Sequence, residues 1–545
     1  MKKRLFKVFV VVMTFITTIS MLFACGGTEN GNANDKRPSI FISVFNGGYG
    51  RTWLDTVVND YNAANPQNKY KLTVRANKDE FSQILSNIQS GTFSSDLFFS
   101  NLYIYKLING GYLENISDIW TSSPDNDGDT IESLMLGSEE YKIAYGDGKG
   151  GLYALPLQES VRTFVYDHDL FLKYGLLFNE SGSFISSPTE KLSKGKDGIE
   201  GTYDDGHPIT EAQWEDMCVK AKQMFGYAFN YTGKFSNYLN DLYYMISAQY
   251  DGVDKWLMNF TFDGTYDFGS GEEVITVENG YKLAEMKGKK VALDFFDKYL
   301  AGKDVSLGIT NTYINPNASN LSYSHTDAQN DYIIWSAQNS TNRCAMLVEG
   351  DYWENEARTT FDTLAREGFG EYAFRTRNYR FMTLPIFEGQ KESGNVYNIA
   401  DNMYIAMLKQ SDSDKKTICK DFIKFMYQKK YIQNFTVESG GLMPYNVELT
   451  SEQKTKLSSF TKNFLELYHD RTHNKFIRND FYSNVYSATK SGAFPSNSHN
   501  GSDYVITNGL YYYSANTYFS KMKDYWVGDW GTRVTAYKKF LEAQV

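Results

Sequence analysis

The sequence predicts an α/β fold, because strand-like and helix-like segments alternate along its first hundred residues. Segments 39–45, 69–74 and 96–99 are rich in β-branched and aromatic residues, and helix-like apolar stripes follow them. This alternation is typical of βαβ units on a parallel sheet. Ligands of such sheets bind beyond the carboxyl ends of the strands, so we expect a binding edge at residues 46–50 and 100–103.

Ordinary stop signals bound the expected helices. The first apolar stripe runs from Trp53 to Tyr61, and Asn65-Pro66 ends it. The second runs from Phe81 to Ile88, and Gly91 ends it.

The N-terminus carries an export signal. Basic residues stand in segment 2–7, and residues 8–24 are uncharged and apolar. This run is somewhat short of the roughly 20 residues that cross a bilayer, which disfavours a permanent anchor helix. The ending LFACG resembles the lipobox of bacterial lipoproteins, although Phe23 is bulkier than usual. The resemblance implies cleavage before Cys25, lipid (diacylglycerol and an acyl chain such as palmitate) on Cys25, and a flexible tether over residues 25–37.

Composition excludes some classes of function. The chain has 545 residues with 55 Lys and Arg against 65 Asp and Glu, and this acidic balance disfavours nucleic-acid binding. The 42 Tyr, 37 Phe and 8 Trp indicate a surface that stacks on a flat, polar ligand. No CxxC motif is present, and we expect Cys218, Cys344 and Cys419 to be buried and reduced; one pair plus a free thiol is the alternative.

Eight segments together resemble one family, in the order in which that family has them. The family is the carbohydrate-type (family 1) extracellular solute-binding proteins of bacterial ABC importers, which includes maltodextrin-binding protein. The segments are FNGGYGRTWLDTVVNDYNAANP, SSDLFFSN, GLYALPLQESVRTFVYDHDLFLKYGL, PITEAQWEDMCVKAKQM, CAMLVEGDYWENEA, RFMTLPIF, KKTICKDFIKFMYQ and FTVESGGLMPYN.

The resemblance implies a two-lobe, type II fold with mixed sheets flanked by helices and a hinged cleft. The first lobe would comprise residues 38–156 and 386–435, and the second residues 162–385 and 436–545, after a signal peptide over residues 1–24. The crossing would be residues 157–161, with Leu155-Pro156 and Leu384-Pro385 at the hinge.

The resemblance implies that the protein captures an oligosaccharide and delivers it to ABC permease subunits. It would be a monomer that is lipid-anchored on the outer face of the membrane of a Gram-positive bacterium. One alternative is the same fold with a peptide or polyamine as cargo. A secreted glycoside hydrolase is the other, but the strand–helix order does not repeat eight times and no G-x-S-x-G or HExxH motif is present. We therefore expect no enzyme and no catalytic cofactor.

Ligand contacts from the second lobe are expected around the segment AMLVEGDYW. The family has a stacking tryptophan after this strand, which implies that role for Trp353. It stands one residue later than usual, so Tyr352 is the alternative candidate for the stacking role. Glu349 and Asp351 could accept hydrogen bonds from sugar hydroxyls. The alternative for Trp353 is a core position at the strand end, and the alternative for the two carboxylates is exposure to solvent.

Further contacts are expected from the first lobe and the crossing. Asn46 and Tyr49 lie in the turn after the first strand, and Asn101 and Tyr103 follow the third strand. Glu159 and Arg162 lie in the crossing, and Asp401 and Asn402 lie in a turn that is usually glycine-rich in the family. Arg162 could instead brace the hinge by pairing with Glu159. Tyr238, Tyr243, Tyr244 and Trp256 are aromatic candidates that we expect mainly to pack.

An acidic, glycine-rich segment at 197–206 gives a candidate structural Ca²⁺ loop with Asp197, Asp204 and Asp205 as ligands. A second acidic segment, 125–129, alternates Asp as an EF-hand does but lacks its glycine and its bidentate Glu. Plain acidic surface loops are the alternative for both.

Overall fold

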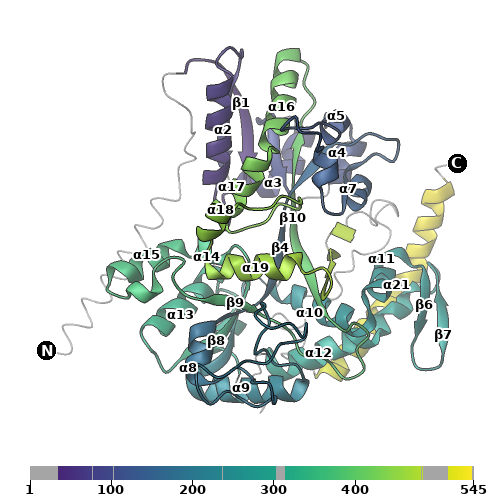
Figure 1. Cartoon of the computed structure of the whole chain (residues 1–545). Helices are drawn as coiled ribbons and strands as arrows, with labels where there is room; N and C mark the ends of the chain where they lie inside the picture. The colour runs from purple at the N-terminus through teal and green to yellow at the C-terminus, as the bar shows by residue number, and fades with distance from the viewer. Residues whose placement is uncertain are drawn as a thin grey trace.

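Two lobes joined by two long strands make up the protein (Figure 1). The computed structural model describes residues 35–76, 78–101, 104–235, 237–301, 313–479, 481–482 and 514–542, with the backbone alone at 78–82, 401–402 and 525–526. The joining strands are β4 (Ala154–Asp167) and β10 (Asn395–Met407). They pair antiparallel with each other and run from one lobe into the other.

The described strands form one nine-stranded mixed sheet and a two-stranded ribbon. The order in the large sheet is β2-β1-β3-β10-β4-β8-β5, with β11 beside β10 and β9 beside β4. β1 pairs in parallel with β2 and β3, as the βαβ pattern predicts. The remaining strands of this sheet are β1 (Ser39–Val44), β2 (Lys71–Ala76), β3 (Leu97–Ser100), β5 (Gly226–Asn230), β8 (Arg343–Gly350), β9 (Tyr379–Met382) and β11 (Asn474–Ile477).

The first lobe has its own apolar core beneath β1, β2 and β3. Its first helix, α2, buries the stripe from Trp53 to Tyr61 and ends at Asn65, as predicted. The helices of this lobe are α2 (Thr52–Ala64), α3 (Lys78–Ser90), α4 (Ile104–Asn109), α5 (Ser117–Trp120), α6 (Ile131–Leu134), α7 (Ser138–Tyr145), α16 (Ser413–Met426), α17 (Lys429–Ser439) and α18 (Ser451–Thr455).

The second lobe packs around β5, β8 and the far half of β4. Helix α9 begins with a capping box in which Thr210 and Gln213 satisfy each other's backbone N–H groups. The helices of this lobe are α8 (His168–Tyr174), α9 (Glu211–Phe225), α10 (Asn237–Asp251), α12 (Lys287–Tyr299), α13 (His325–Ala337), α14 (Trp353–Glu356), α15 (Arg358–Arg366), α19 (Ser459–His469) and the 3-10 turns η3 (Pro316–Ser319) and η4 (Gly370–Tyr372).

Two of the crossings between the lobes are strand segments, and a third lies between α18 and α19. On β4, Leu157 packs in the first core and Val161 in the second; on β10, Ile399 packs in the second core and Met403 in the first. The second crossing therefore lies at 400–402, not at the expected Leu384-Pro385, because β10 continues unbroken from one core to the other. Residues 386–399 consequently belong with the second lobe. Met443, Tyr445 and α18, which were expected in the second lobe, belong with the first.

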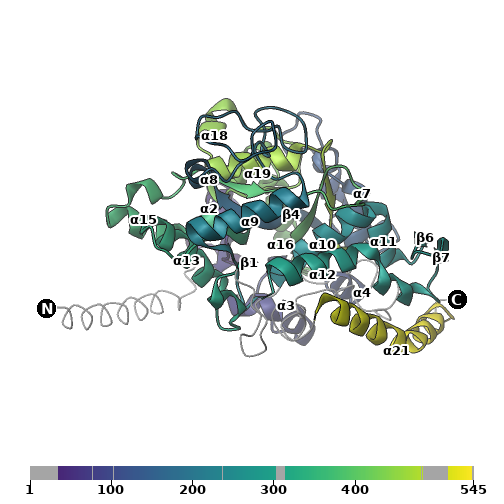
Figure 2. The same ribbon diagram turned by 90° about the horizontal axis from the view of Figure 1, so that it is seen from below.

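A small third core joins the C-terminal helix to the second lobe. Trp530 of α21 (Ala515–Glu542) packs among residues of α11 (Val253–Thr261), β6 (Gly264–Asp267), β7 (Glu272–Ile275) and η1 (Gly280–Glu285). Figure 2 shows α21 along the outside of this lobe, beside α12. Residues 483–513, which precede α21, lie outside the described part of the chain.

One further sequence expectation concerns the cysteines; the expected export signal at residues 1–24 and the lipid site Cys25 lie outside the described residues. Cys218, Cys344 and Cys419 are buried and unpaired with one another, which confirms the expectation of buried, reduced thiols. No helix among the described residues is long and apolar enough to cross a membrane.

Candidate ligand-binding site

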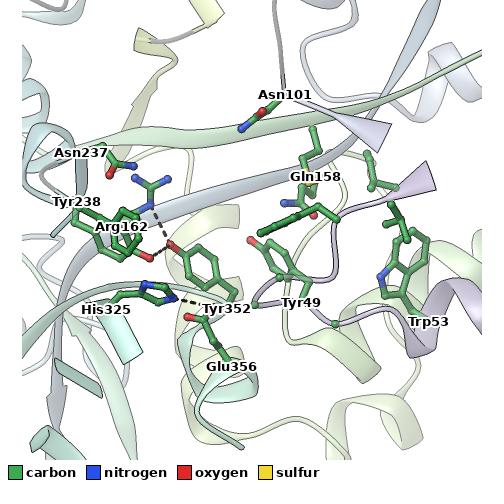
Figure 3. A pocket seen from close by; sticks show the side chains of 18 residues that line it. Tyr49, Trp53, Asn101, Gln158, Arg162, Asn237, Tyr238, His325, Tyr352 and Glu356 are labelled. Carbon is green, nitrogen blue, oxygen red and sulfur yellow. Dashed lines mark hydrogen bonds and ion pairs between the residues drawn. The ribbon is translucent and has the colours of Figure 1, made fainter. Parts of the chain in front are cut away.

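A cavity of about 300 Å³ lies where the two lobes meet (Figure 3). Its walls come from both lobes and from both crossing strands. The lining residues are Val44, Phe45, Gly47, Gly48, Tyr49, Gly50, Trp53, Asn101, Leu157, Gln158, Arg162, Phe235, Asn237, Tyr238, His325, Tyr352, Glu356 and Met403.

The cavity lies at the carboxyl ends of β1 and β3, as expected for parallel strands. β1 ends at Val44, and the turn that follows leads directly into α2. Gly48 in this turn has no room for a side chain, because a Cβ atom there would lie 2.5 Å from the Tyr352 ring. Glycine therefore allows the turn of the first lobe to approach the second lobe.

Hydrogen bonds join the lobes along this side of the cavity. The Tyr49 hydroxyl donates to Asp351 Oδ2 at 2.8 Å, and Asn355 Nδ2 donates to the Gly48 carbonyl oxygen at 2.7 Å. Asp351 Oδ1 accepts from Ser160 Oγ at 2.8 Å and from the Val161 N–H at 3.1 Å. Burial raises the pKa of Asp351 to about 7, although these donors favour the carboxylate.

Arg162 is held rigidly on the second-lobe side. Its Nη1 donates to Asp241 Oδ2 at 3.0 Å, and its Nε donates to the Tyr352 hydroxyl at 3.1 Å. The guanidinium carbon lies 4.9 Å from the centre of the Tyr238 ring, and the Tyr352 hydroxyl donates to that of Tyr238 at 3.1 Å. Arg162 therefore braces two aromatic rings and pairs with Asp241, not with Glu159 as one interpretation of the sequence had it.

Two glutamates lie behind and beside His325. His325 Nε2 lies 3.2 Å from Glu356 Oε1, and Gln329 Nε2 donates to Glu356 Oε2 at 2.8 Å and to Glu349 Oε1 at 3.0 Å. Burial, and next the charge of Glu356, raise the pKa of Glu349 well above its usual value. Glu349 lies behind the wall, whereas Glu356 lines the cavity.

Four of the predicted site residues line the cavity: Tyr49, Asn101, Arg162 and Tyr352. Asp351 and Glu349 lie buried directly behind the wall, and Asn46 is exposed and does not line it. Tyr103 lies outside the described residues, as do the side chains of Asp401 and Asn402. The backbone at 401–402 pairs with β4 as part of β10, so the turn expected there is a strand with an irregular register.

Trp353 does not have the position of a stacking platform. Its side chain is 0% exposed, and its ring contacts Tyr332, Phe361, Tyr379 and Phe460 at centroid distances of 4.9–6.1 Å. The preceding residue, Tyr352, reaches the cavity instead. The structure thus gives Trp353 the alternative role, a core tryptophan at a strand end.

Glu159 also faces away from the cavity. It is fully buried, and its carboxylate accepts from Arg478 Nε at 2.7 Å, from the Tyr141 hydroxyl at 2.5 Å and from the Tyr468 hydroxyl. Burial alone would raise the pKa of Glu159, but Arg478 and the two hydroxyls hold it below its usual value. Side chains alternate along β4, which places its neighbour Gln158 on the cavity side. Leu157 also lines the cavity, at a point where the register of β4 against β10 is irregular.

Sequence reasoning missed several lining residues. Trp53 belongs to the apolar stripe of α2, so periodicity assigned it to the core, and it serves both the core and the cavity. Tyr238 was expected to pack. Asn237 and His325 begin α10 and α13, and no motif marks them as cavity residues.

The acidic segments have local partners. In segment 125–129, Lys429 Nζ pairs with Asp127 at 2.7 Å and Asp129 at 2.6 Å. In the other, Asp204 Oδ2 accepts backbone N–H groups of Lys196 and Asp197. Among the described residues, no group of three or more His, Cys, Asp or Glu side chains is placed to hold a metal ion. Calcium at Asp197, Asp204 and Asp205 stays a prediction.

Comparison with known proteins identifies the family. A family model described as "Bacterial extracellular solute-binding protein" matches residues 47–433, so this chain belongs to that family. The sequence resemblance and the α/β, two-lobe fold class are thereby confirmed. A comparison with curated proteins gave no match.

Solved structures share the fold at low sequence identity. One is a "Chitin oligosaccharide binding protein" with 14% identity and a TM-score of 0.52, covering 91% of this chain and 99% of that one. Another comes from work on xylan utilization by Caldanaerobius polysaccharolyticus, with 12% identity, a TM-score of 0.52 and 89% and 99% coverage. The GacH receptor of Streptomyces glaucescens has 11% identity, a TM-score of 0.50 and 90% and 97% coverage.

Proposed function

We propose that this protein is a lipid-anchored extracellular receptor that captures an oligosaccharide and delivers it to the permease subunits of an ABC transporter. One observation carries the proposal: the cavity between the lobes is lined from both sides by aromatic rings and planar polar groups. Sugars need both, because ring faces cover their C–H patches and planar polar groups bind their hydroxyls.

The charge of the lining supports a neutral or nearly neutral ligand. Among the described lining residues, Glu356 alone carries a carboxylate, and it already pairs with His325. A polyamine receptor would need several carboxylates facing its ligand. Two proteins with this fold are described as binding chitin oligosaccharide and acarbose, which are carbohydrates.

The proposed mechanism involves no bond-making step. A ligand that contacts both lobes favours the closed form over the open one, since only the closed form makes all of these contacts. A permease can then distinguish loaded from empty receptor by shape. The tether keeps the receptor near the membrane.

Calorimetric titration of the mature chain tests the cargo. The panel contains neutral oligosaccharides, peptides and polyamines, and we expect binding only to the oligosaccharides. Asn101→Ala should weaken that binding, whereas Asn109→Ala, on the exposed end of α4, should leave it unchanged. Binding confined to peptides or polyamines contradicts the proposal, and release of shorter sugars during the titration would indicate a hydrolase.

Lipid anchoring is tested separately at Cys25. We expect the mature protein to begin at this residue, to carry a diacylglycerol and acyl mass, and to partition into detergent. Cys25→Ala should release the protein from the membrane fraction without changing affinity for the ligand. An unmodified, membrane-free wild-type chain contradicts this part of the proposal.

A further inference from the structure

The cavity has two chemically different walls. The first-lobe side and the adjoining crossing strands contribute an apolar wall of Val44, Phe45, Trp53, Leu157 and Met403, together with the polar groups of Tyr49, Asn101 and Gln158. The second-lobe side contributes one apolar ring, Phe235, and otherwise hydrogen-bonding groups, which form the polar wall: Arg162, Asn237, Tyr238, His325, Tyr352 and Glu356. Figure 3 shows Trp53 at one end of the cavity and Arg162, Asn237 and Tyr238 at the other.

The apolar wall is part of a packed core and offers few hydrogen bonds. Met403, Val44 and Trp53 are 8%, 3% and 4% exposed and belong to the first core. A sugar hydroxyl pressed against the side chain of Val44 or Met403 would lose water and gain no partner from that side chain, which is unfavourable. A methyl group in the same place would gain from leaving water.

The polar wall is satisfied within itself but still presents polar edges. Arg162, Tyr352 and Tyr238 form one hydrogen-bonded group, and His325 pairs with Glu356. Such preorganised groups fix the orientation of a ligand. A ligand that fits both walls is therefore polar along one edge and carries an apolar substituent on the opposite edge.

The size of the cavity limits how much ligand it encloses. A volume of about 300 Å³ is at the lower end of the range of roughly 300–1,000 Å³ for ligand pockets. The enclosed part is thus a small terminal portion of an oligosaccharide, and the two walls select the identity of that portion.

We propose, on the basis of the proposed function, that the enclosed sugar unit carries a methyl group, which lies against the wall formed by Val44, Leu157 and Met403. Two sugar classes supply a methyl group: 6-deoxyhexoses, through their C-methyl, and N-acetylhexosamines, through their acetamido group. Hydroxyls of the same unit face Arg162 and Asn237.

Matched ligand pairs test this proposal by calorimetry on the mature chain. One pair is di-N-acetylchitobiose against cellobiose, which share a backbone and differ at the acetamido group. The other is L-fucose against L-galactose, which differ by one hydroxyl. We expect the methyl-bearing member of one pair to bind at least about tenfold tighter, and the pair that shows this identifies the sugar class.

Variants connect the preference to the wall. Met403→Gln keeps the approximate size of the side chain but makes it polar, and we expect it to reduce the preference at least about threefold. Met135→Gln is the matched control, since Met135 is 6% exposed in the same core but does not line the cavity. Val44→Thr is a second variant with nearly unchanged shape, and melting temperatures establish that each variant folds.

The possible failures are distinguishable. Equal or weaker binding of the methyl-bearing sugars, alongside tight binding of hydroxyl-only oligosaccharides, overturns this inference and leaves the proposed function standing. An unchanged preference in folded Met403→Gln and Val44→Thr also overturns it. Absence of binding to every carbohydrate in the panel overturns the proposed function itself.

Discussion

The hydroxyl of Tyr49 donates a 2.8 Å hydrogen bond to Asp351 Oδ2 and so joins the first lobe to the second at the wall of the cavity. The rings of Tyr49 and Tyr352 also meet edge to face, with centroids 5.5 Å apart. Asn355 adds a third contact through the Gly48 carbonyl oxygen. These contacts require the lobes to be close together, so they stabilise the closed form that we expect to hold the ligand.

Removing the Tyr49 hydroxyl should therefore weaken ligand binding. In the closed form, Tyr49→Phe leaves the buried Asp351 carboxyl without this donor, which destabilises that form by about 0.5–1.5 kcal/mol. The open form lacks this hydrogen bond in either protein and is therefore not affected. We expect the dissociation constant from calorimetry to rise by roughly 2–12-fold. The control is Tyr153→Phe, because the Tyr153 hydroxyl donates to Asp147 Oδ2 at 3.0 Å within one lobe. Equal losses in the two variants contradict a role in closure.

Asp351 should also make stability depend on pH. Burial raises its pKa from 3.8 to about 7, so the folded state holds its proton more tightly than the unfolded state does. This contribution is fully present below pH 3.8 and is lost as pH rises through about 7. It amounts to at most about 4 kcal/mol, since one pKa unit corresponds to about 1.36 kcal/mol.

Asp351→Asn removes this titration. We expect thermal unfolding to show a smaller loss of stability between pH 5 and pH 8 in this variant than in the wild type. Asp147→Asn is the control, because hydrogen bonds, chiefly from the Lys149 N–H, lower the pKa of Asp147 below its usual value. That group is ionised in both states over this range and should not alter the slope. Identical slopes in wild type and Asp351→Asn contradict the assignment.

The position of Trp353 leads to a prediction about folding. Trp353→Ala removes a fully buried ring from among four aromatic neighbours, and such truncations cost about 3–5 kcal/mol. We expect urea unfolding to show a loss of this size. A stacking residue would behave in the opposite way, with a large loss of ligand affinity and little loss of stability.

Much of the first lobe could be predicted from the sequence because its local signals agree with its packing. The stripe of α2, the stop at Asn65 and the parallel pairing of β1 with β2 all follow from periodicity and turn residues. The carboxyl-end rule also located the cavity near Val44 and Asn101. These features depend on neighbouring residues in the chain, which a sequence displays directly.

The site itself was less predictable because long-range packing decides it. Tyr352 and Trp353 are adjacent and aromatic, and only the path of the chain after β8 determines which ring reaches the cavity. Glu159 and Gln158 are adjacent on β4, and strand alternation sends one carboxylate to the hinge and one amide to the cavity. Arg478, the partner of Glu159, lies more than 300 residues away, so no local pattern indicates it.

The ion pair of Glu159 with Arg478 should hold the crossing in place. Glu159→Gln leaves the Arg478 charge buried without its main partner, and such losses cost about 3–5 kcal/mol. The matched control is Glu140→Gln, since Glu140 also pairs with Arg478 at 2.6 Å but has a side chain that is 39% exposed. Because the Glu140 carboxylate is partly solvated, we expect its removal to cost less than the removal of the Glu159 carboxylate. Equal destabilisation of the two variants in urea would show that burial at the crossing, where β4 passes between the cores, does not set the strength of this pair.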